Sequence, residues 1–446
     1  MDSVAKICSY RNIWKVAYPV LISLIMEQLI GMTDTAFLGR VGEVELGASA
    51  IAGVYYMVLY MIGFGFSIGA EIIIARRNGE KEYKETGNIF YHGIFFLLAL
   101  CFVIILLSEA VSPWLMSRII ASDHVREAAV GYIRFRLPGL FCAYMTGMFR
   151  AFYIGTTQTR TLSLNSIMMV LSNVVFNWFL IFGHGGLPAM GIRGAAIGST
   201  LAELVSLIFF LVYTIRRTDY RKYGLDHFKG FSFRKLENIL SVSVWTMILN
   251  VVSLSTWLIF FVSIEHLGER YLAVSNIIRS ISGLLWMVMM AFASTCSALV
   301  SNLIGSGHSD SVKMLIRRIL KITYGVTAVM VVLIVGFPEA VIHIYTDIPD
   351  LVEASKPSLW VLCASYVVTV PANVFSQAVA GTGNTRKSFI LEMISLAFYM
   401  AYCFLVINVL HSSVAVCWTA EFAYGIPMMI LSCLYLAGGR WKGRSI

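Results

Sequence analysis

Long apolar runs follow one another along almost the whole chain of 446 residues. A helix that crosses a bilayer needs about 20 mostly apolar residues, whereas a membrane strand needs about 9–11. The runs are far longer than a membrane strand, so they predict an all-α integral membrane protein. We expect twelve membrane-spanning helices, at 13–38, 48–75, 88–111, 128–153, 161–183, 194–215, 236–264, 272–304, 315–337, 355–380, 387–409 and 412–436.

The charged residues are few and unevenly placed. They make up 13% of the chain, whereas soluble proteins carry about 25%. The net charge of +9 does not indicate nucleic-acid binding, because basic residues are scattered between the apolar runs. They favour alternate connecting segments, a pattern that sets orientation in a membrane. We expect a multi-pass protein of the cell inner membrane with both termini cytoplasmic. The cytoplasmic set includes Arg76, Arg77, Lys81, Lys84, Arg150, Arg160, Arg216, Arg217, Arg221, Lys222, Arg386 and Lys387.

The two halves of the chain resemble each other. Residues 155–160, Gly-Thr-Thr-Gln-Thr-Arg, recur as Gly-Thr-Gly-Asn-Thr-Arg at 381–386. Six predicted helices separate the copies, so both copies have the same orientation. Internal repeats of this kind are typical of transporters, which handle substrate between the repeats. We predict an N-terminal six-helix lobe at 1–215, a basic cytoplasmic linker at 216–235 and a C-terminal six-helix lobe at 236–446.

The first predicted helix carries acidic and amide side chains. A charged side chain at the bilayer centre costs at least about 2.5–3.5 kcal/mol, so each charged residue in a span calls for a structural or functional explanation. Glu27 and Asp34 share one helix face, and Gln28 lies beside them. Pro19 precedes them and is expected to kink the helix. An acidic helix face that can bend suits an ion-coupled carrier, although Asp34 could instead serve as a structural hydrogen-bond acceptor.

Further polar side chains lie in other predicted helices. Asn173 and Asn177 share one face of the fifth, where they could tune the proton affinity of Asp34 or simply join helices. The sixth carries Ser199, Thr200 and Glu203, and Arg134 and Arg136 are expected near the outer end of the fourth. Candidates for a substrate cleft are Glu27, Gln28, Asn250, Asn276, Asn373 and Gln377.

Motifs for catalysis are missing from the sequence. It has no GxxxxGK[ST], HExxH or GxSxG motif. The eight cysteines form no CxxC pair and most lie in apolar runs, so they predict neither a disulfide framework nor a metal site. The histidines are scattered. We therefore expect no enzyme, no catalytic residue, no cofactor and no structural metal.

In this order, the motifs resemble the MATE (multidrug and toxic compound extrusion) transporters. The resemblance rests on Pro19 with Thr33-Asp34-Thr35, on residues 74–79 (Ile-Ala-Arg-Arg-Asn-Gly), on the pair Asn173 and Asn177, and on the repeated turns. It implies two six-helix bundles that form a V-shaped cleft. It also implies that organic, often cationic, compounds leave in exchange for H⁺ or Na⁺.

The resemblance further implies residue roles. Asp34 matches an acidic residue that takes part in ion coupling, Asn173 and Asn177 match polar residues near it, and Thr200 approximates a hydroxyl of the sixth helix. Some members carry an aspartate where Asn177 stands, and others carry acids in the seventh and tenth helices that are missing here. We therefore expect coupling through the N-terminal lobe, with a single carboxylate suiting H⁺ somewhat better than Na⁺ near Asp34.

An alternative reading is a flippase for a lipid-linked oligosaccharide or a related lipid. A diphosphate would need a cleft lined with basic residues, and Arg279 is the main basic residue expected inside the membrane. The expected partners are lipophilic or cationic small molecules and the lipid bilayer, with no nucleic acid, and we expect a monomer. Protonation of Asp34 is expected to let the first helix bend at Pro19 and release substrate.

Overall fold

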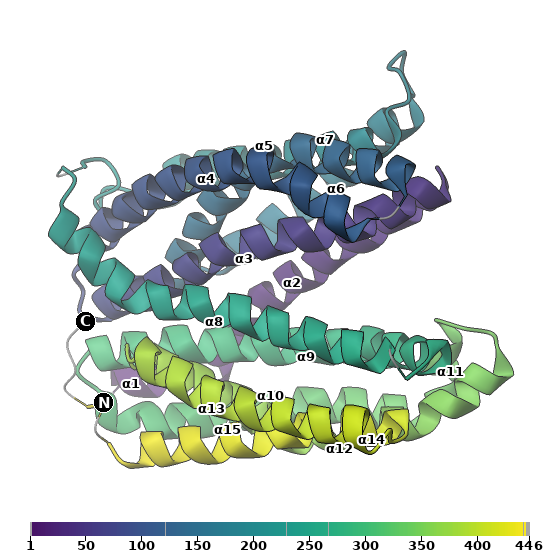
Figure 1. The fold of residues 1–446 in the computed structure, drawn as a ribbon. Helices are drawn as coiled ribbons and strands as arrows, with labels where there is room; N and C mark the ends of the chain where they lie inside the picture. The colour runs from purple at the N-terminus through teal and green to yellow at the C-terminus, as the bar shows by residue number, and fades with distance from the viewer. Residues whose placement is uncertain (1, 121, 229, 266, 440, 443–446) are drawn as a thin grey trace. The chain divides into compact units, whose positions relative to one another are not determined.

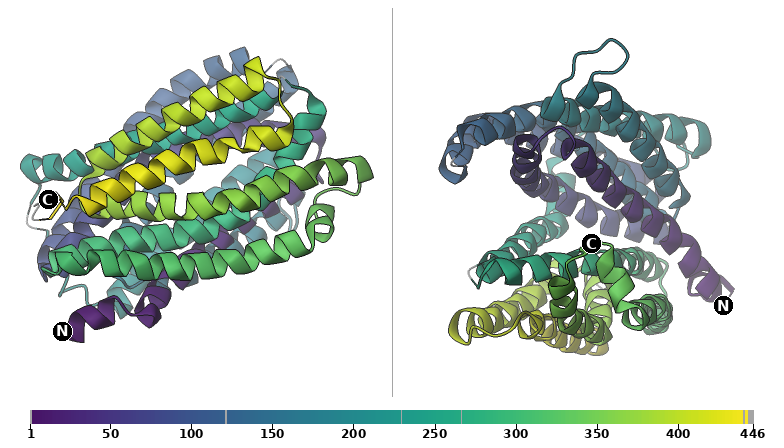
Figure 2. Two further views of the ribbon diagram at one scale, coloured as in Figure 1. Left: turned by 90° about the horizontal axis from the view of Figure 1, so that it is seen from below. Right: turned by 90° about the vertical axis from the view of Figure 1, so that its right-hand side faces the viewer.

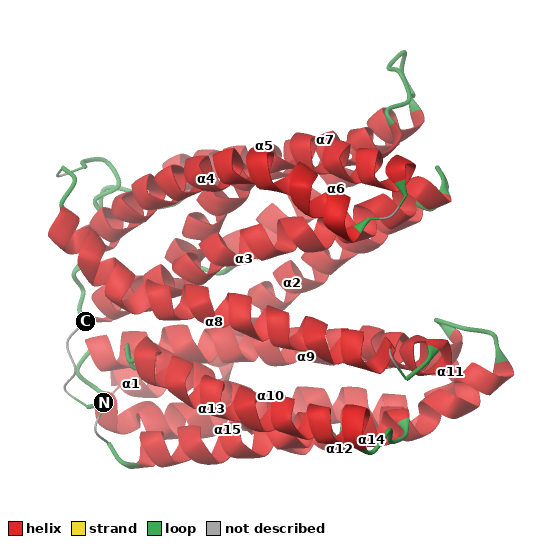
Figure 3. Ribbon diagram, in the orientation of Figure 1, coloured by secondary structure: helices red, strands yellow, loops and turns green. Residues whose placement is uncertain are grey.

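The computed structural model describes residues 2–120, 122–228, 230–265, 267–439 and 441–442. These residues form helices joined by loops and no strands (Figure 3). The helices are α1 (Asp2–Ile7), α2 (Tyr10–Leu38), α3 (Glu43–Gly79), α4 (Tyr83–Ile119), α5 (Asp123–Gly155), α6 (Arg160–Phe182), α7 (Gly191–Arg217), α8 (Phe233–Glu265), α9 (Glu269–Gly305), η1 (Ser309–Ser311), α10 (Val312–Gly336), α11 (Pro338–His343), α12 (Pro349–Gly381), α13 (Thr385–Cys403), the π-helix η2 (Phe404–Val409), α14 (Val414–Trp418) and α15 (Ala420–Ala437).

The predicted all-α fold with twelve long spans is confirmed. Each predicted span coincides with a helix, or with two consecutive helical pieces in the last two spans. Within the described residues, eleven of these segments are long and apolar enough to cross a membrane. The exception is α5, whose interior carries Arg136 and Arg150. Its place among the other spans is explained by the partners of those two side chains, given below.

The chain divides into two compact units (Figure 1). The N-terminal unit is Tyr18–Ile248, and the C-terminal unit is Met1–Ala17 with Leu249–Ile446. The divisions therefore fall inside α2 and inside α8 rather than in loops. The predicted domain boundaries at 215 and 236 stay a prediction, as does the V-shaped cleft.

The segment predicted as a linker packs on the N-terminal unit. It is a loop between the end of α7 at Arg217 and the start of α8 at Phe233. The hydroxyl of Tyr91 on α4 donates to the carbonyl of Leu225 at 2.5 Å, and the backbone N–H of Ser232 lies 3.0 Å from Nε2 of His92. Lys235, at the start of α8, forms an ion pair with Glu85 at 3.0 Å. Lys229 lies outside the described residues.

The sequence repeat corresponds to a repeated helix contact. Gly155 ends α5 and Gly381 ends α12. A Cβ on Gly155 would lie 3.1 Å from the carbonyl oxygen of Glu71 on α3, and one on Gly381 would lie 2.5 Å from that of Ser297 on α9. Each residue of the second contact lies 226 positions after its counterpart in the first contact. Glycine at both places lets two backbones meet, as small residues do between membrane helices.

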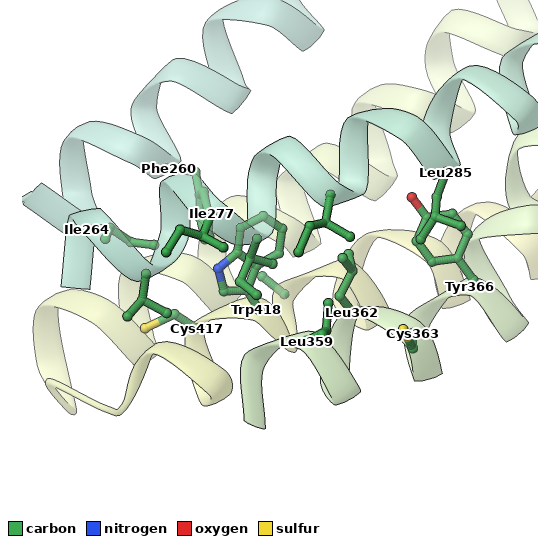
Figure 4. Packing of buried hydrophobic residues seen from close by; sticks show 14 of the residues in the cluster. Phe260, Ile264, Ile277, Leu285, Leu359, Leu362, Cys363, Tyr366, Cys417 and Trp418 are labelled. Atoms are coloured by element: carbon green, nitrogen blue, oxygen red, sulfur yellow. The ribbon is translucent and has the colours of Figure 1, made fainter. Parts of the chain in front are cut away.

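The core of the C-terminal unit surrounds Trp418, which lies at the break between α14 and α15 (Figure 4). The ring of Phe260 on α8 meets the Trp418 indole edge-on, with centroids 5.6 Å apart. The indole N–H donates to Oγ of Ser275 on α9 at 3.4 Å. In the same unit α13 runs alongside α15, as Figure 2 shows. Close van der Waals packing of this kind holds membrane helices together, because lipid offers no hydrophobic drive.

Gly65 brings α3 against α8 in the N-terminal unit. A Cβ there would lie 2.6 Å from Cα of Met247, and backbone cannot move aside cheaply. We expect Gly65→Ala to destabilise the protein by about 1–3 kcal/mol, a typical cost of overpacking. The measurement is the thermal unfolding midpoint in detergent. Gly53→Ala on the same helix is the control, because its Cβ would meet nothing within 4 Å. Equal midpoints for both variants would contradict the prediction.

Candidate functional site

Asp34 on α2 is held by neutral donors from two other helices. Nδ2 of Asn177 on α6 donates to one carboxylate oxygen at 2.5 Å, and Oγ of Ser199 on α7 donates to the other at 3.0 Å. Asn173 supports both donors: its Nδ2 donates to Ser199 Oγ at 3.1 Å, and its Oδ1 accepts from Asn177 at 3.2 Å. The expected contact between Asp34 and the paired asparagines is present. In the described part of the chain, Asp34 forms no ion pair.

Asn177 retains an acceptor without a partner. Both asparagines are fully buried, and Oδ1 of Asn177 has no hydrogen-bond partner among the described residues. Such orphan acceptors are uncommon in proteins, and each calls for an explanation. Gly198 makes room for this oxygen, since a Cβ at that position would collide with it. The cluster therefore contains one carboxylate and one spare buried acceptor side by side.

Thr200 is not part of this cluster. Its hydroxyl donates to the carbonyl of Phe135 at 3.2 Å, and the neighbouring Ser199 supplies the hydroxyl on Asp34 instead. Successive helix positions point about 100° apart, so the choice between two adjacent hydroxyls depends on the rotation of α7. Sequence patterns do not determine the rotation of α7 precisely enough to choose between two adjacent residues.

A cavity of about 380 Å³ lies within the N-terminal unit. Its walls come from α2, α3, α5, α6 and α7, and they combine aromatic rings with charged side chains. The charged side chains form two ion pairs, one of Glu27 with Arg150 and one of Arg136 with Glu203. Other lining residues include Ser23, Tyr56, Tyr60, Asn165, Ser166 and Phe210.

The pair of Arg136 and Glu203 is closed and bidentate. Two guanidinium nitrogens donate to the two carboxylate oxygens at 2.7 and 2.6 Å, and the side chains are 11% and 10% exposed. The guanidinium also lies over the ring of Tyr56, 4.0 Å from its centroid. The sequence placed Arg136 near the outer end of its span. Because α5 begins at Asp123, five residues before the predicted start, Arg136 lies further inside the helix than predicted. Its side chain is buried, and Glu203 neutralises its charge.

The pair of Glu27 and Arg150 is more open. Arg150 donates to Oε1 of Glu27 and to Oγ of Ser23, and the Glu27 side chain is 39% exposed. Ser23 also bonds Ser166 on α6, with the oxygens 2.7 Å apart. The grouping of Arg150 with the basic loop residues was wrong, because its side chain points into the bundle. In the sequence, each pair could have been inferred from an acidic residue in one apolar span and a basic residue in another.

The remaining candidates lie elsewhere. Gln28 lines a second hollow along α2 with Gly31, Met32, Thr35 and Ala36. The C-terminal unit contains Asn250, Asn276, Asn373 and Gln377, on α8, α9 and α12. There Asn276 is exposed, and Asn373 donates to the carbonyl of Thr369 at 2.9 Å.

Pro19 lies inside α2, two residues after the division between the compact units at Ala17 and Tyr18. A proline in a helix interior removes a backbone hydrogen bond and weakens the helix locally. Its position suits a bending point, and its role stays a prediction.

A resident metal site needs several strong ligands. No group of three or more His, Cys, Asp or Glu side chains that could hold a metal occurs in the residues that the structure describes. A monovalent cation near Asp34 would have to draw on carboxylate, amide and hydroxyl oxygens. The oxygens within the cluster belong to Asp34, Asn173, Asn177 and Ser199.

Known proteins resemble this chain over nearly its whole length. The profile of the MatE family matches residues 19–179 and 238–405. A probable multidrug resistance protein NorM of Thermotoga maritima is 25% identical over 444 residues, covering 98% of this chain and 94% of the relative. A probable multidrug resistance protein NorM of Synechocystis sp. is 26% identical over 349 residues, covering 76% and 74%.

Solved structures show the same fold. A MATE crystal structure in complex with MaD3S superposes with a TM-score of 0.86 at 20% identity, covering 99% of this chain and 98% of that one. A MOP superfamily transporter from Pyrococcus furiosus gives 0.85 at 19% identity, covering 99% and 97%.

The helices and these likenesses define a multi-pass membrane transporter. The chain belongs to the MatE family, and the predicted resemblance is confirmed.

Proposed function

We propose that this protein is a secondary multidrug transporter of the cell inner membrane. It exports organic, often cationic, compounds in exchange for inward H⁺ or Na⁺. The names of the relatives support the multidrug part of this proposal. Both termini are cytoplasmic in this proposal, since basic residues concentrate in the connecting segments on that side.

The observation that carries the coupling proposal is the environment of Asp34. Glu27 and Glu203 are each neutralised by an arginine, whereas both oxygens of Asp34 accept only from the neutral side chains of Asn177 and Ser199. A membrane carboxylate without a cationic partner gains most from binding a proton or a metal ion. Asp34 is therefore a side chain of the N-terminal unit that is suited to exchange a cation.

The mechanism follows from the hydrogen bonds. A protonated Asp34 has an O–H that needs an acceptor, and the orphan Oδ1 of Asn177 can supply one if the amide rotates. That rotation removes the Asn177 donor from Asp34 and loosens α2 from α6. The helix can then bend near Pro19 and weaken the hold on substrate. Proton and substrate would bind with negative coupling, so each lowers the affinity for the other.

H⁺ and Na⁺ make different demands on this cluster. A proton needs one carboxylate oxygen and a rearranged acceptor, whereas Na⁺ needs several oxygens held around one point. Only one member of the cluster carries a negative charge, which favours H⁺.

The flippase alternative is less well supported by the basic residues. Arg136 and Arg150 lie inside the N-terminal unit, and each is neutralised by a glutamate. Arg279 lies in the C-terminal unit, over the rings of Trp257 and Phe261. A diphosphate would have to displace those carboxylates, whereas a dedicated phosphate site offers unpaired donors.

The test is ethidium transport in proteoliposomes containing the full-length protein. A pH gradient and a Na⁺ gradient are imposed separately, with a collapsed gradient as the control. We expect uphill ethidium transport under the pH gradient. Transport under the Na⁺ gradient alone would replace H⁺ by Na⁺, and no transport under either gradient, with folded protein, would contradict antiport and favour the lipid substrate.

A further inference from the structure

His92 is a buried histidine on α4 that the proposed transport mechanism does not use. Its ring is fully buried where the loop between α7 and α8 packs on α4. Nδ1 lies 2.8 Å from the carbonyl oxygen of Asn88, one turn earlier on the same helix, and Nε2 lies 3.0 Å from the backbone nitrogen of Ser232 in the loop. In the described part of the chain, Asn88 and Ser232 are the hydrogen-bond partners of the ring.

These two contacts define the protonation state of the ring. The backbone N–H of Ser232 can only donate, so Nε2 accepts, and the single proton of the neutral ring is on Nδ1, where it donates to Asn88. A second proton would have to bind to Nε2. That nitrogen would then present an N–H to the N–H of Ser232, and the hydrogen bond would be lost. The contact between α4 and the loop therefore requires a neutral histidine.

The surroundings of the ring provide no acidic partner for a positive charge. The ring of Phe231 stacks on the imidazole, with centroids 5.2 Å apart, and the ring of Phe228 lies 5.8 Å away. Aromatic faces attract a cation and would compensate its charge in part. A charge buried without an acidic partner is nevertheless costly, and Glu85, the acid nearest to the start of α4, is paired with Lys235.

Other titratable groups lie on the elements packed around this end of α4. In the residues that the structure describes, none of them hydrogen-bonds to the ring or forms an ion pair with it. They are Glu71, Arg76 and Arg77 on α3, Tyr91 on α4, Arg150 on α5, Asp226 and His227 in the loop, and Arg234 on α8.

The histidine contacts the point where the loop becomes a helix. Ser232 immediately precedes α8, which begins at Phe233. The division between the two compact units falls further along this helix, between Ile248 and Leu249, so α8 belongs to both units. Loss of the contact with His92 would therefore loosen the start of a helix that joins the two units.

We infer that His92 is a pH-sensitive latch on the loop between α7 and α8. The neutral ring holds the backbone of Ser232 against α4, and the protonated ring releases it and loosens the first turn of α8. An imidazole changes its charge between about pH 5 and 8, so the latch is closed at the upper end of this range and opens as the pH falls. In the orientation proposed above, the latch faces the cytoplasm, which inward flow of H⁺ acidifies. The inference goes beyond the proposed transport function and does not depend on it.

Hydrogen–deuterium exchange, read by mass spectrometry, tests the latch in the purified full-length protein in detergent. The measured quantity is the exchange rate of the Ser232 amide divided by its intrinsic chemical rate at the same pH. Two conditions, about pH 7.5 and about pH 5.5, lie on either side of the titration of an ordinary imidazole. We expect the normalised rate of the wild type to rise by at least about tenfold on acidification, because an opening that takes up one proton gains up to about tenfold per pH unit. Peptides from α9 should keep their protection at both pH values, which excludes general unfolding by acid.

Two variants identify the titrating group. His92→Gln provides an amide oxygen that can accept from Ser232 and that does not change its charge in this pH range. The normalised rate of this variant should be the same at both pH values, whether or not the amide restores the hydrogen bond. The matched control is His227→Gln. His227 is exposed in the same loop, so its replacement should leave the pH response of the wild type unchanged.

Three results would overturn the inference. The first is a normalised rate at Ser232 that does not change with pH in the wild type. The second is a pH response that persists in His92→Gln, and the third is a pH response that disappears in His227→Gln, since either would assign the response to another group. The exchange measurement needs no ion gradient, so failure of gradient-driven transport leaves the latch intact, and failure of the latch leaves the transport proposal intact.

Discussion

Replacing Asp34 with asparagine is expected to reduce ion-driven transport to the level of protein-free vesicles while leaving the protein folded. The amide has the shape of the carboxylate, and its oxygen can still accept from Asn177 or Ser199. It cannot bind and release a proton, so in the proposed mechanism the step that links the gradient to export is lost. The measurement is ethidium transport in proteoliposomes under the gradient that drives the wild type.

Two controls separate loss of coupling from loss of structure. The unfolding midpoint of Asp34→Asn should stay near the wild-type value. Asp34→Glu keeps a titratable carboxylate and should retain part of the transport. Full gradient-driven transport by a folded Asp34→Asn protein would remove Asp34 from the coupling mechanism.

Breaking the pair of Arg136 and Glu203 is expected to give the largest loss of stability. Glu203→Gln removes the negative partner and leaves the guanidinium of Arg136 buried over the Tyr56 ring without a carboxylate to neutralise it. Removing one partner of a buried ion pair typically costs about 3–5 kcal/mol. The unfolding midpoint and the yield of folded protein in detergent should both fall sharply.

A double variant tests whether the unpaired charge is the cause. Arg136→Met with Glu203→Leu removes both charges, and such apolar replacements of buried pairs are often neutral or stabilising. Its midpoint should therefore recover most of the loss. Glu339→Gln breaks the exposed pair with Lys356 and should change the midpoint little, because water screens it. A midpoint for Glu203→Gln equal to that of Glu339→Gln would show that the buried pair does not stabilise the protein.

Part of the Asp34 cluster could be read from the sequence. An aspartate in an apolar helix needs partners, and Asn173 and Asn177 lie one turn apart on one face of another helix. From that spacing, a contact of the two asparagines with Asp34 could be predicted. It did not separate Ser199 from Thr200, since adjacent residues face different sides and the rotation of α7 about its axis depends on packing.

The ion pairs show where local patterns fail. Arg150 follows a long apolar run and precedes a turn, which is also where a cytoplasmic arginine would lie. Only the approach of α2 to α5 gives it a partner in Glu27. The same holds for Arg136 and Glu203, which are 67 positions apart in the chain.

The sequence by itself determined the helical spans and the two-fold repeat, because the bilayer requires about 20 apolar residues in each span and internal hydrogen bonding of the backbone. These are local properties of a segment and its solvent. The tertiary structure alone decided which polar side chains meet. That outcome depends on the rotation and approach of whole helices, as Gly65 against α8 and Gly155 against α3 show, and no single segment encodes it.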